Sequence, residues 1–292
     1  MSNIQEEIKL NASKVDAYLN SYFKNQNSNS KLFEAMKYGL FSGGKMIRSY
    51  LVHAACKVFD IKEKDYIPIA AAIECVHSYS LIHDDLPSMD NDDFRRGKES
   101  THKAYGEFTA ILAGSSLLTM AFEMISDHNF KIPDEKKTKI IHALSFCSGH
   151  LGIAGGQFYD LSLEKEKVSQ DLIIDMQNKK TGALMGFCTE VACILANKEN
   201  EREAFKDMGV KLGLLFQIAD DFLDKYGKKE TLGKPSQQDE VKGKNTLLSH
   251  LGEDKTKELV TKIKSEIENG LKQYSNTNAL IDVMHYMTER KS

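Results

Sequence analysis

Helix-breaking residues are scarce in this chain, and their scarcity constrains the fold more than any other feature of the sequence. Only 4 of the 292 residues are proline, so long uninterrupted helices can form along most of the chain. Apolar residues recur at helical spacing, for example Leu32, Met36 and Leu40. We find no segment with the apolar–polar alternation of a half-buried strand, and no internal repeat. The sequence therefore predicts an all-α protein.

Residues 225–245 form the one long polar stretch, which mixes Gly, Lys, Gln and Pro. Such a stretch is either a linker between domains or a loop beside a functional site. Both flanks have helical sequence, and too few residues follow for a second hydrophobic core. We predict a single domain over residues 1–292 with a flexible loop near 225–245 beside the site. A shorter loop is expected at residues 25–30, between the first two helices.

Charge and composition exclude several classes of protein. The chain has 39 basic and 42 acidic residues and a net charge of −3, whereas nucleic-acid-binding proteins usually have a basic excess. Its first residues are polar and acidic, without the apolar segment of a signal peptide. No apolar run approaches the ~20 residues of a membrane span, and the best candidate, residues 183–196, contains Glu190. We therefore expect a cytoplasmic protein with no membrane span and no nucleic-acid partner.

Cysteine and histidine spacing does not favour a zinc site. The 5 cysteines include no CxxC pair, which favours buried free thiols over disulfides or a zinc ribbon. His77 and His83 are six residues apart, so a helix would place them on different faces. No third ligand accompanies them.

The first acidic cluster follows a helix that we expect to run from about residue 69 to Asp84. The helix is apolar on most sides, which predicts burial, and Pro87 is expected to end it. Asp84, Asp85 and Asp90 are followed by the pair Arg95-Arg96. Carboxylate oxygens are the ligands that Mg²⁺ prefers, although a solvated acidic loop is the alternative.

The second acidic cluster lies within residues 208–226, which also have helical periodicity. Nearly all positions there are apolar, apart from one narrow stripe. Buried carboxylates are too costly unless a cation neutralises them, so the stripe is either a metal site or an exposed polar face. Its members are Gly213, Gln217, Asp220, Asp221 and Asp224.

Basic residues form separate sets. Gly43 and Gly44 precede Lys45 and Arg48, which we expect to lie one helical turn apart and to bind a phosphate group. Further sets are Arg95-Arg96 and residues 179–182. Two acidic and several basic sets imply two phosphorylated ligands, one of which loses its phosphate to a metal-assisted step. The glycine-rich residues 149–160, which include Asp160, are interpreted as helix packing.

Several of these stretches match the motifs of one enzyme family in order and spacing. They are GGKMIRS (43–49), ECVHSYSLIHDDLPSMDNDDFRRG (74–97), GGQFYDL (155–161), KTGALM (180–185), FQIADDFLDKYG (216–227), TLGK (231–234) and GKNT (243–246). On these motifs the chain resembles the trans-isoprenyl diphosphate synthases, and most closely the bacterial members that make farnesyl diphosphate.

The resemblance implies the isoprenoid synthase fold, a bundle of long helices around a deep apolar cavity. It also implies an Mg²⁺-dependent prenyltransferase that acts on small-molecule diphosphates and forms a homodimer. An allylic diphosphate (dimethylallyl, then geranyl) ionises, isopentenyl diphosphate attacks the cation, and loss of a proton completes each condensation.

The same resemblance implies roles for individual residues. Mg²⁺ would be bound by Asp84, Asp90 and Asp220, and the water molecules on it would be oriented by Asp85, Asp221 and Asp224. Isopentenyl diphosphate would be bound by Gly44, Lys45, Arg48, His77 and Arg96. The allylic diphosphate would be bound by Arg95, Lys180, Thr181, Gln217 and Lys234. The Lys180 carbonyl, Thr181 and Gln217 would also place partial negative charge near the cation.

Product length is expected to depend on Tyr79 and Ser80. In the family, an aromatic residue five positions before the first aspartate accompanies a C15 product when the first motif also has a two-residue insertion of the Pro-Ser type. A smaller or more flexible residue accompanies C20. This chain has Tyr79-Ser80 together with Pro87-Ser88, which predicts C15. Alternatives are a geranylgeranyl or longer-chain synthase, a terpene cyclase, and a non-catalytic subunit of a heteromeric synthase. The chain departs from the family pattern GGKRxRP at Met46 and Ser49, which replace a basic residue and a proline.

Overall fold

The structure, a computed structural model, describes residues 2–26, 28–227 and 243–289. These residues are helical apart from loops and one short hairpin, so the all-α prediction is confirmed. They divide into two compact units, one of Ser2–His53 with Ile61–His142 and the other of Ala54–Asp60 with Ala143–Ser292. Most of the predicted 225–245 loop, residues 228–242, lies outside the described residues. The single-domain organisation stays a prediction.

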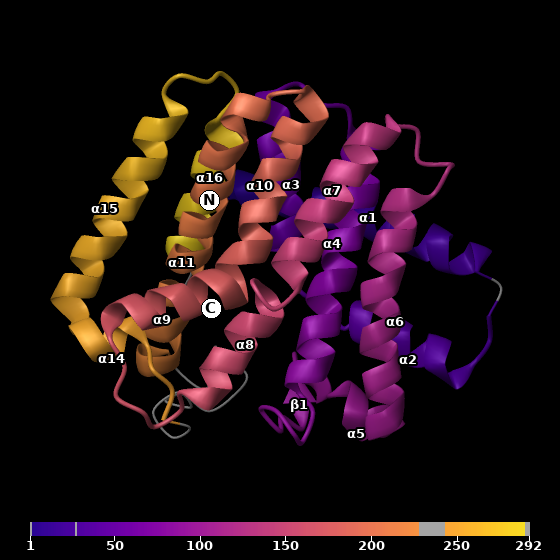
Figure 1. The fold of residues 1–292 in the computed structure, drawn as a ribbon, viewed down its shortest axis with the longest axis horizontal. Helices are drawn as coiled ribbons and strands as arrows, with labels where there is room; N and C mark the ends of the chain where they lie inside the picture. The colour runs from indigo at the N-terminus through magenta and orange to yellow at the C-terminus, as the bar shows by residue number, and fades with distance from the viewer. Residues whose placement is uncertain (1, 27, 228–242, 290–292) are drawn as a thin grey trace. The chain divides into compact units, whose positions relative to one another are not determined.

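The first unit is built around helix α4 (Glu63–Asp84), which packs against α6 (Glu107–Ser126) along most of its length (Figure 1). Ile69, Ile73 and Val76 of α4 are fully buried, and each such side chain stabilises the fold by about 1.5–3 kcal/mol. The other helices of this unit are α1 (Ser2–Asn25), α2 (Lys31–Leu40), α5 (Thr101–Tyr105) and the first parts of α3 (Ile47–Val58) and α7 (Asp134–Ser148).

Helix α4 ends at Asp84, as the position of Pro87 predicts, but its predicted start is wrong. The helix begins at Glu63, six residues before the expected residue 69, and it continues through Pro68. Proline removes one helical hydrogen bond, yet burial of Tyr66 and Ile69 on either side holds this segment in the core.

A hairpin that the sequence analysis did not predict connects the first acidic cluster to α5. Strands β1 (Phe94–Arg95) and β2 (Lys98–Glu99) pair antiparallel, with Arg95 opposite Lys98. Two-residue strands are too short to produce a detectable alternation of apolar and polar residues. The turn between them holds Arg96 at φ 53° and Gly97 at φ 77°, which are the dihedrals of the tight mirror-image turns preferred in hairpins.

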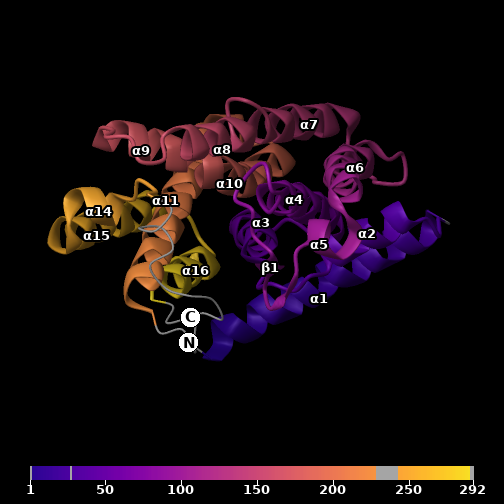
Figure 2. The same cartoon turned by 90° about the horizontal axis from the view of Figure 1, so that it is seen from below.

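The second unit is centred on α10 (Ala183–Ala196) and α11 (Arg202–Tyr226), which pack against each other. Figure 2 shows the C-terminal helices gathered beside α11. Leu212, Leu215 and Ile218 of α11 are fully buried. The remaining helical elements are α8 (Ile153–Ser162), α9 (Gln170–Gln177), η1 (Asn178–Gly182), η2 (Glu199–Glu201), α14 (Leu247–Leu251), α15 (Glu253–Leu271) and α16 (Asn278–Thr288), together with the last parts of α3 and α7.

Element η1 is one turn of π-helix inserted between α9 and α10. Such single turns are rare and are frequently found at functional sites. Gly156 of α8 allows the closest approach to it, because a Cβ at Gly156 would lie 2.1 Å from the backbone nitrogen of Lys180. The expected helix packing of the glycine-rich stretch is confirmed at this position.

The prediction that residues 183–196 are the best candidate for a membrane span is wrong. Among the described residues, helix α6 (Glu107–Ser126) is the one helix that is long and apolar enough to cross a membrane by length and composition. Half of its apolar window is buried inside the protein. A core helix with one buried face and one exposed apolar face has the same composition. All five cysteines are buried and free, as predicted.

Candidate functional site

The first unit holds one group of predicted site residues, which we name the arginine cluster: Gly44, Arg48, His77, Asp84, Asp85, Asp90, Arg95 and Arg96. The end of α4 and the loop after it form its acidic part. The loop folds back over the helix end, so that the amide of Asp90 donates to the carbonyl oxygen of Asp84 at 2.9 Å and the amide of Asp92 donates to that of Asp85 at 3.2 Å. Main-chain hydrogen bonds therefore bring Asp84 and Asp90, six residues apart, side by side.

Arg95 projects from the hairpin to Asp85. Its Nε donates to Oδ1 and Oδ2 of Asp85 at 2.9 and 2.8 Å, and its Nη2 donates to Oδ1 at 2.5 Å. Asp85 is 2% exposed. Burial raises the pKa of its carboxyl, although the neighbouring Arg95 opposes the shift. The predicted allylic ligand Arg95 is therefore held by an aspartate of the first motif.

Arg96 occupies the left-handed position of the hairpin turn and reaches the Gly-Gly segment. A Cβ on Gly44, which has φ +135°, would lie 2.6 Å from the guanidinium carbon of Arg96. Only glycine accommodates both this backbone conformation and this contact. Gly44 and Arg96 were both predicted to bind isopentenyl diphosphate, and the structure brings them into contact.

Arg48 and His77 form the third part of the arginine cluster, where Nη1 of Arg48 lies 3.1 Å from Nε2 of His77. Burial lowers the pKa of His77 well below its ordinary value, and the nearby arginines lower it further. His77 is therefore neutral at physiological pH, and its Nε2 accepts a hydrogen bond from Arg48.

The predicted helical spacing of Lys45 and Arg48 is wrong. Helix α3 begins at Ile47, and Met46 has a left-handed φ of 47°. Lys45 therefore precedes the helix, where it is exposed. Two hydrogen bonds fix this bend, because Oγ of Ser49 donates to the carbonyl of Met46 at 2.8 Å and the amide of Ser49 donates to Oε1 of Glu74 at 3.0 Å. A proline, which the family commonly has at this position, could make neither bond.

The chain-length candidates lie on the same helix as the first aspartate. Tyr79 is 9% exposed, and its ring contacts that of His83 edge-to-face at 5.5 Å. Oγ of the neighbouring Ser80 donates to the carbonyl of His77 at 2.9 Å. The buried ring of Tyr79 therefore lies one and a half turns before Asp84 on the same helix.

The second unit holds the other group, which we name the lysine cluster: Asp160, Lys180, Thr181, Gln217, Asp221 and Lys244. Its hydrogen bonds extend from η1 to α11. Oγ1 of Thr181 donates to Oε1 of Gln217, and Nε2 of Gln217 donates to Oδ1 of Asp221, both at 3.3 Å. Asp221 is 3% exposed, whereas Asp220 and Asp224 on the same helix are half-buried. The three aspartates of the stripe therefore differ in burial, and none of them is fully exposed.

Two residues of this cluster, Asp160 and Lys244, were not predicted as site residues. Nζ of Lys180 and Nζ of Lys244 both donate to Oδ2 of Asp160, at 2.5 and 3.0 Å. From the sequence, Asp160 was assigned to packing and Lys244 to no role, although both lie in stretches that matched the family. Burial alone would raise the pKa of Asp160, but the two lysines hold it below its ordinary value. The predicted ligand Lys234 lies outside the described residues.

The lysine cluster surrounds a pocket of about 80 Å³. Its walls come from α8, α9, η1, α11 and the segment before α14. Cationic, amide and hydroxyl groups therefore converge with two aspartates, Asp160 and Asp221, a set of groups suited to a diphosphate with a bound cation. The lining residues are Asp160, Met176, Gln177, Lys180, Thr181, Gln217, Asp221, Lys244, Asn245 and Thr246.

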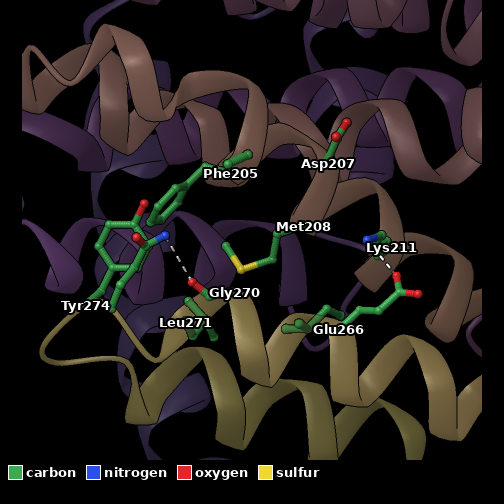
Figure 3. Close-up of a pocket in the computed structure, with 11 residues that line it drawn as sticks. Phe205, Asp207, Met208, Lys211, Glu266, Gly270, Leu271 and Tyr274 are labelled. Carbon is green, nitrogen blue, oxygen red and sulfur yellow. Dashed lines mark hydrogen bonds and ion pairs between the residues drawn. The ribbon is translucent and has the colours of Figure 1, made fainter.

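A second pocket of the same unit lies between α11 and α15 and has a volume of about 220 Å³ (Figure 3). Its walls are largely apolar, with Met208 and Leu271 among them. An ion pair joins Nζ of Lys211 to Oε2 of Glu266 at 2.7 Å. No residue predicted to bind substrate or metal lines this pocket, so it is not the candidate site.

The carboxylates of the two acidic motifs are the candidate ligands for a metal ion. In ranges 2–26, 28–227 and 243–289, no three His, Cys, Asp or Glu side chains already form a metal site. The donor chemistry nevertheless fits Mg²⁺, because each acidic motif offers only carboxylate oxygens and no Cys or His within it. The adjacency of Asp84 and Asp90 is a further point of fit.

The chain matches the polyprenyl synthetase family over residues 29–284. It is 38% identical to the farnesyl diphosphate synthase of Bacillus subtilis over 239 residues, which are 81% of each chain. It is 36% identical to that of Escherichia coli over 269 residues, 90% of each chain. It is also 36% identical to geranylgeranyl pyrophosphate synthase 4 of Arabidopsis thaliana over 265 residues, covering 89% of this chain and 71% of that one.

Solved structures are similar over nearly the whole chain. An FPP/GFPP synthase from Zymomonas mobilis has a TM-score of 0.86 and 34% identity, with coverage of 98% of this chain and 99% of that chain. A geranyltransferase from Helicobacter pylori, complexed with magnesium and isoprenyl diphosphate, has a TM-score of 0.83 and 27% identity, with coverage of 97% and 98%.

Proposed function

Because the chain belongs to the polyprenyl synthetase family, we propose that it is a prenyltransferase that makes farnesyl diphosphate. It condenses isopentenyl diphosphate with dimethylallyl diphosphate and then with geranyl diphosphate. The observation that best supports this proposal is the lysine cluster, where Lys180 and Lys244 meet beside Gln217 and Asp221 of the second aspartate motif. Two cations beside an acidic motif suit the diphosphate that leaves during the reaction.

The allylic substrate loses its diphosphate when its C1–O bond breaks. Lys180 and Lys244, with Arg95 and Lys234, would hold the departing oxygens. Thr181 and Gln217, which are hydrogen-bonded to each other, would present their oxygens to the cation that remains. The double bond of isopentenyl diphosphate would then attack that cation and form the new carbon–carbon bond. The proton lost in the last step would pass to the released diphosphate.

The acceptor keeps its diphosphate, so its ligands need no metal. Arg48 and Arg96 would bind this group, with Lys45 and the backbone at Gly44. Neutral His77 orients Arg48 through the 3.1 Å contact between Nε2 and Nη1, which leaves the guanidinium its full positive charge. A fixed pair of forked donors binds a phosphate group in one orientation.

Mg²⁺ would be held by Asp84, Asp90 and Asp220, and Asp85, Asp221 and Asp224 would orient its water molecules. When bound, it would supply positive charge to the departing diphosphate. This assignment is supported by the carboxylate-only donors of both motifs and by the main-chain bond that joins Asp84 to Asp90.

The test of the proposed function is incubation of the purified protein with Mg²⁺, isopentenyl diphosphate and dimethylallyl diphosphate. A C15 product supports the proposal. A predominant C20 product would instead support the geranylgeranyl alternative. The similarity to geranylgeranyl pyrophosphate synthase 4 of Arabidopsis thaliana is the reason to test for this product. Absence of any condensation product would support a non-catalytic subunit. A cytoplasmic location is part of the proposal, since both substrates are highly charged.

Two substitutions should separate the substrate sites. Arg48→Ala is expected to raise the KM for isopentenyl diphosphate about tenfold with little change in kcat, because that contact is similar in ground and transition states. Lys180→Ala is expected to lower kcat more, because this side chain binds the leaving group. Steady-state kinetics with each substrate varied would check the pattern. The reverse pattern would mean that the two sites are assigned the wrong way round.

Helix α6 supports a homodimer. Its sequence from Phe108 to Phe122 contains no charged residue, and Phe108, Ile111 and Leu112 are 74%, 45% and 50% exposed. These positions follow helical spacing and form one apolar face. A contiguous apolar face of this kind is typical of an interface, and we propose that a second copy of this chain covers it.

The double substitution Phe108→Asp with Leu112→Asp is expected to convert the dimer to a monomer, since it places two charges in the proposed interface. Size-exclusion chromatography with light scattering would measure the mass. Leu10→Asp, at a 59% exposed position of α1, is the matched control and should remain dimeric. A monomeric wild-type protein would contradict the dimer without affecting the proposed chemistry.

A further inference from the structure

Asp160 is the one carboxylate of the lysine cluster that lies outside both aspartate motifs. Its side chain is 8% exposed, while those of Lys180 and Lys244 are 26% and 15% exposed. Both lysines donate to the same oxygen, Oδ2. The three residues line the pocket assigned to the allylic diphosphate, so the proposal below rests on the proposed function.

Three separate chain segments are fixed around this carboxylate. The close approach at Gly156 sets Lys180, on the π-helical turn, against the helix that bears Asp160. The segment with Lys244 is attached to the end of the same helix, because the amide of Lys165 donates to the carbonyl of Gly243 at 2.9 Å. Nδ2 of Asn245 donates to the carbonyl of Leu163 at 2.7 Å.

Two ammonium groups in one small pocket repel each other. A carboxylate that accepts from both offsets this repulsion, holds the two amines close together and leaves the trio with a net charge of +1. The same carboxylate reduces the attraction for an incoming anion. Its expected benefit is therefore the orientation of the two amines, and not a higher affinity for the bound substrate in its ground state.

We propose that Asp160 is a positioning residue that holds the amines of Lys180 and Lys244 together and oriented toward the leaving diphosphate. Asp160 does not touch the reacting atoms. When the substrate binds, its diphosphate oxygens take over part of the hydrogen bonding of the two amines, and Asp160 keeps them directed into the pocket.

The test replaces the charge and keeps the shape. Asp160→Asn is expected to lower kcat about tenfold, while the affinity for inorganic pyrophosphate at pH 7, measured by calorimetry, stays equal or increases. The KM for the allylic diphosphate should change little, so that the loss appears in kcat. A merely structural role would lower kcat and pyrophosphate affinity together, and this result would overturn the proposal.

The chain offers a matched control. Asp175 accepts from the neighbouring Lys179 at 2.6 Å on an exposed surface, with its side chain 50% exposed. Asp175→Asn removes the same charge from the same type of pair, outside the pocket, and should leave kcat, KM and pyrophosphate affinity unchanged.

Two further variants keep the proposal falsifiable if Asp160→Asn folds poorly. Asp160→Glu retains the charge and displaces it by one methylene, so kcat should fall, because the amines are no longer held in the same place, while pyrophosphate affinity stays near the wild-type value. In a Lys244→Met background, Asp160→Asn should have much less effect than alone, because residues that act together are non-additive. A wild-type kcat in the Glu variant, or additive effects in the double variant, would overturn the proposal.

Failure of this inference is distinguishable from failure of the proposed function. Pyrophosphate binding requires no turnover, so its affinity in Asp160→Asn tests the lysine pair directly. A wild-type protein that forms no prenyl product would contradict the function, while the binding measurement would still decide the role of Asp160.

Discussion

Asp84→Asn and Asp220→Asn are each expected to lower kcat/KM about a thousandfold, equivalent to about 4 kcal/mol of transition-state stabilisation. Each substitution removes a negative charge from a proposed Mg²⁺ ligand but keeps the size of the side chain. Each residue lies on a helix that is held in the hydrophobic core by other side chains, such as Ile73 on α4 and Leu215 on α11. The fold should therefore survive, and circular dichroism would check it beside the kinetics.

A control for the first motif lies three residues after Asp90. The side chain of Asp93 is 55% exposed and pairs with Lys103 at 3.1 Å, an arrangement that contributes little at a surface. Asp93→Asn should retain nearly full activity. Near-normal turnover of Asp84→Asn or Asp220→Asn at ordinary Mg²⁺ concentration would refute the metal assignment. Calorimetry of Mg²⁺ binding with pyrophosphate present would report the same loss without turnover.

Tyr79→Ala is expected to change the main product from C15 to C20. Tyr79 is a buried residue of α4, one and a half turns before Asp84. The growing prenyl chain would extend along α4, away from the metal ions and toward Tyr79. Truncation removes most of the ring and leaves a cavity, at a cost of about 3 kcal/mol in stability. Chromatography of the dephosphorylated products would measure the distribution.

Tyr66→Ala separates product length from stability. Tyr66 is also a buried tyrosine of α4, 2% exposed, and its hydroxyl lies 2.6 Å from Nδ1 of His53. This variant should lose comparable stability and still make C15. A Tyr79→Ala enzyme that remains active and stops at C15 would show that another residue limits the chain.

The local parts of this protein were predictable from sequence. Periodicity predicted α11 and the narrow stripe of Gln217, Asp220, Asp221 and Asp224, because helical spacing alone decides which residues share a face. Pro87 likewise predicted the end of α4, and the cysteine spacing predicted free thiols. The motifs placed the chain in its family, which the match over residues 29–284 confirms. The roles of the individual site residues stay predictions.

Tertiary structure decided which of these residues meet. Asp160 lies 20 residues from Lys180 and 84 from Lys244, and no local pattern predicts that one carboxylate oxygen accepts from both. The π-helical turn at Lys180 lies directly against Gly156 of another helix, and the segment after Met46 is hydrogen-bonded through the amide of Ser49 to Glu74, 25 residues further on. Periodicity reports the conformation of neighbours in sequence. Burial and hydrogen bonding between distant segments accompany the departures from regular helix, such as the π-helical turn at Lys180 and the bend at Met46. Both departures lie next to residues proposed to bind substrate.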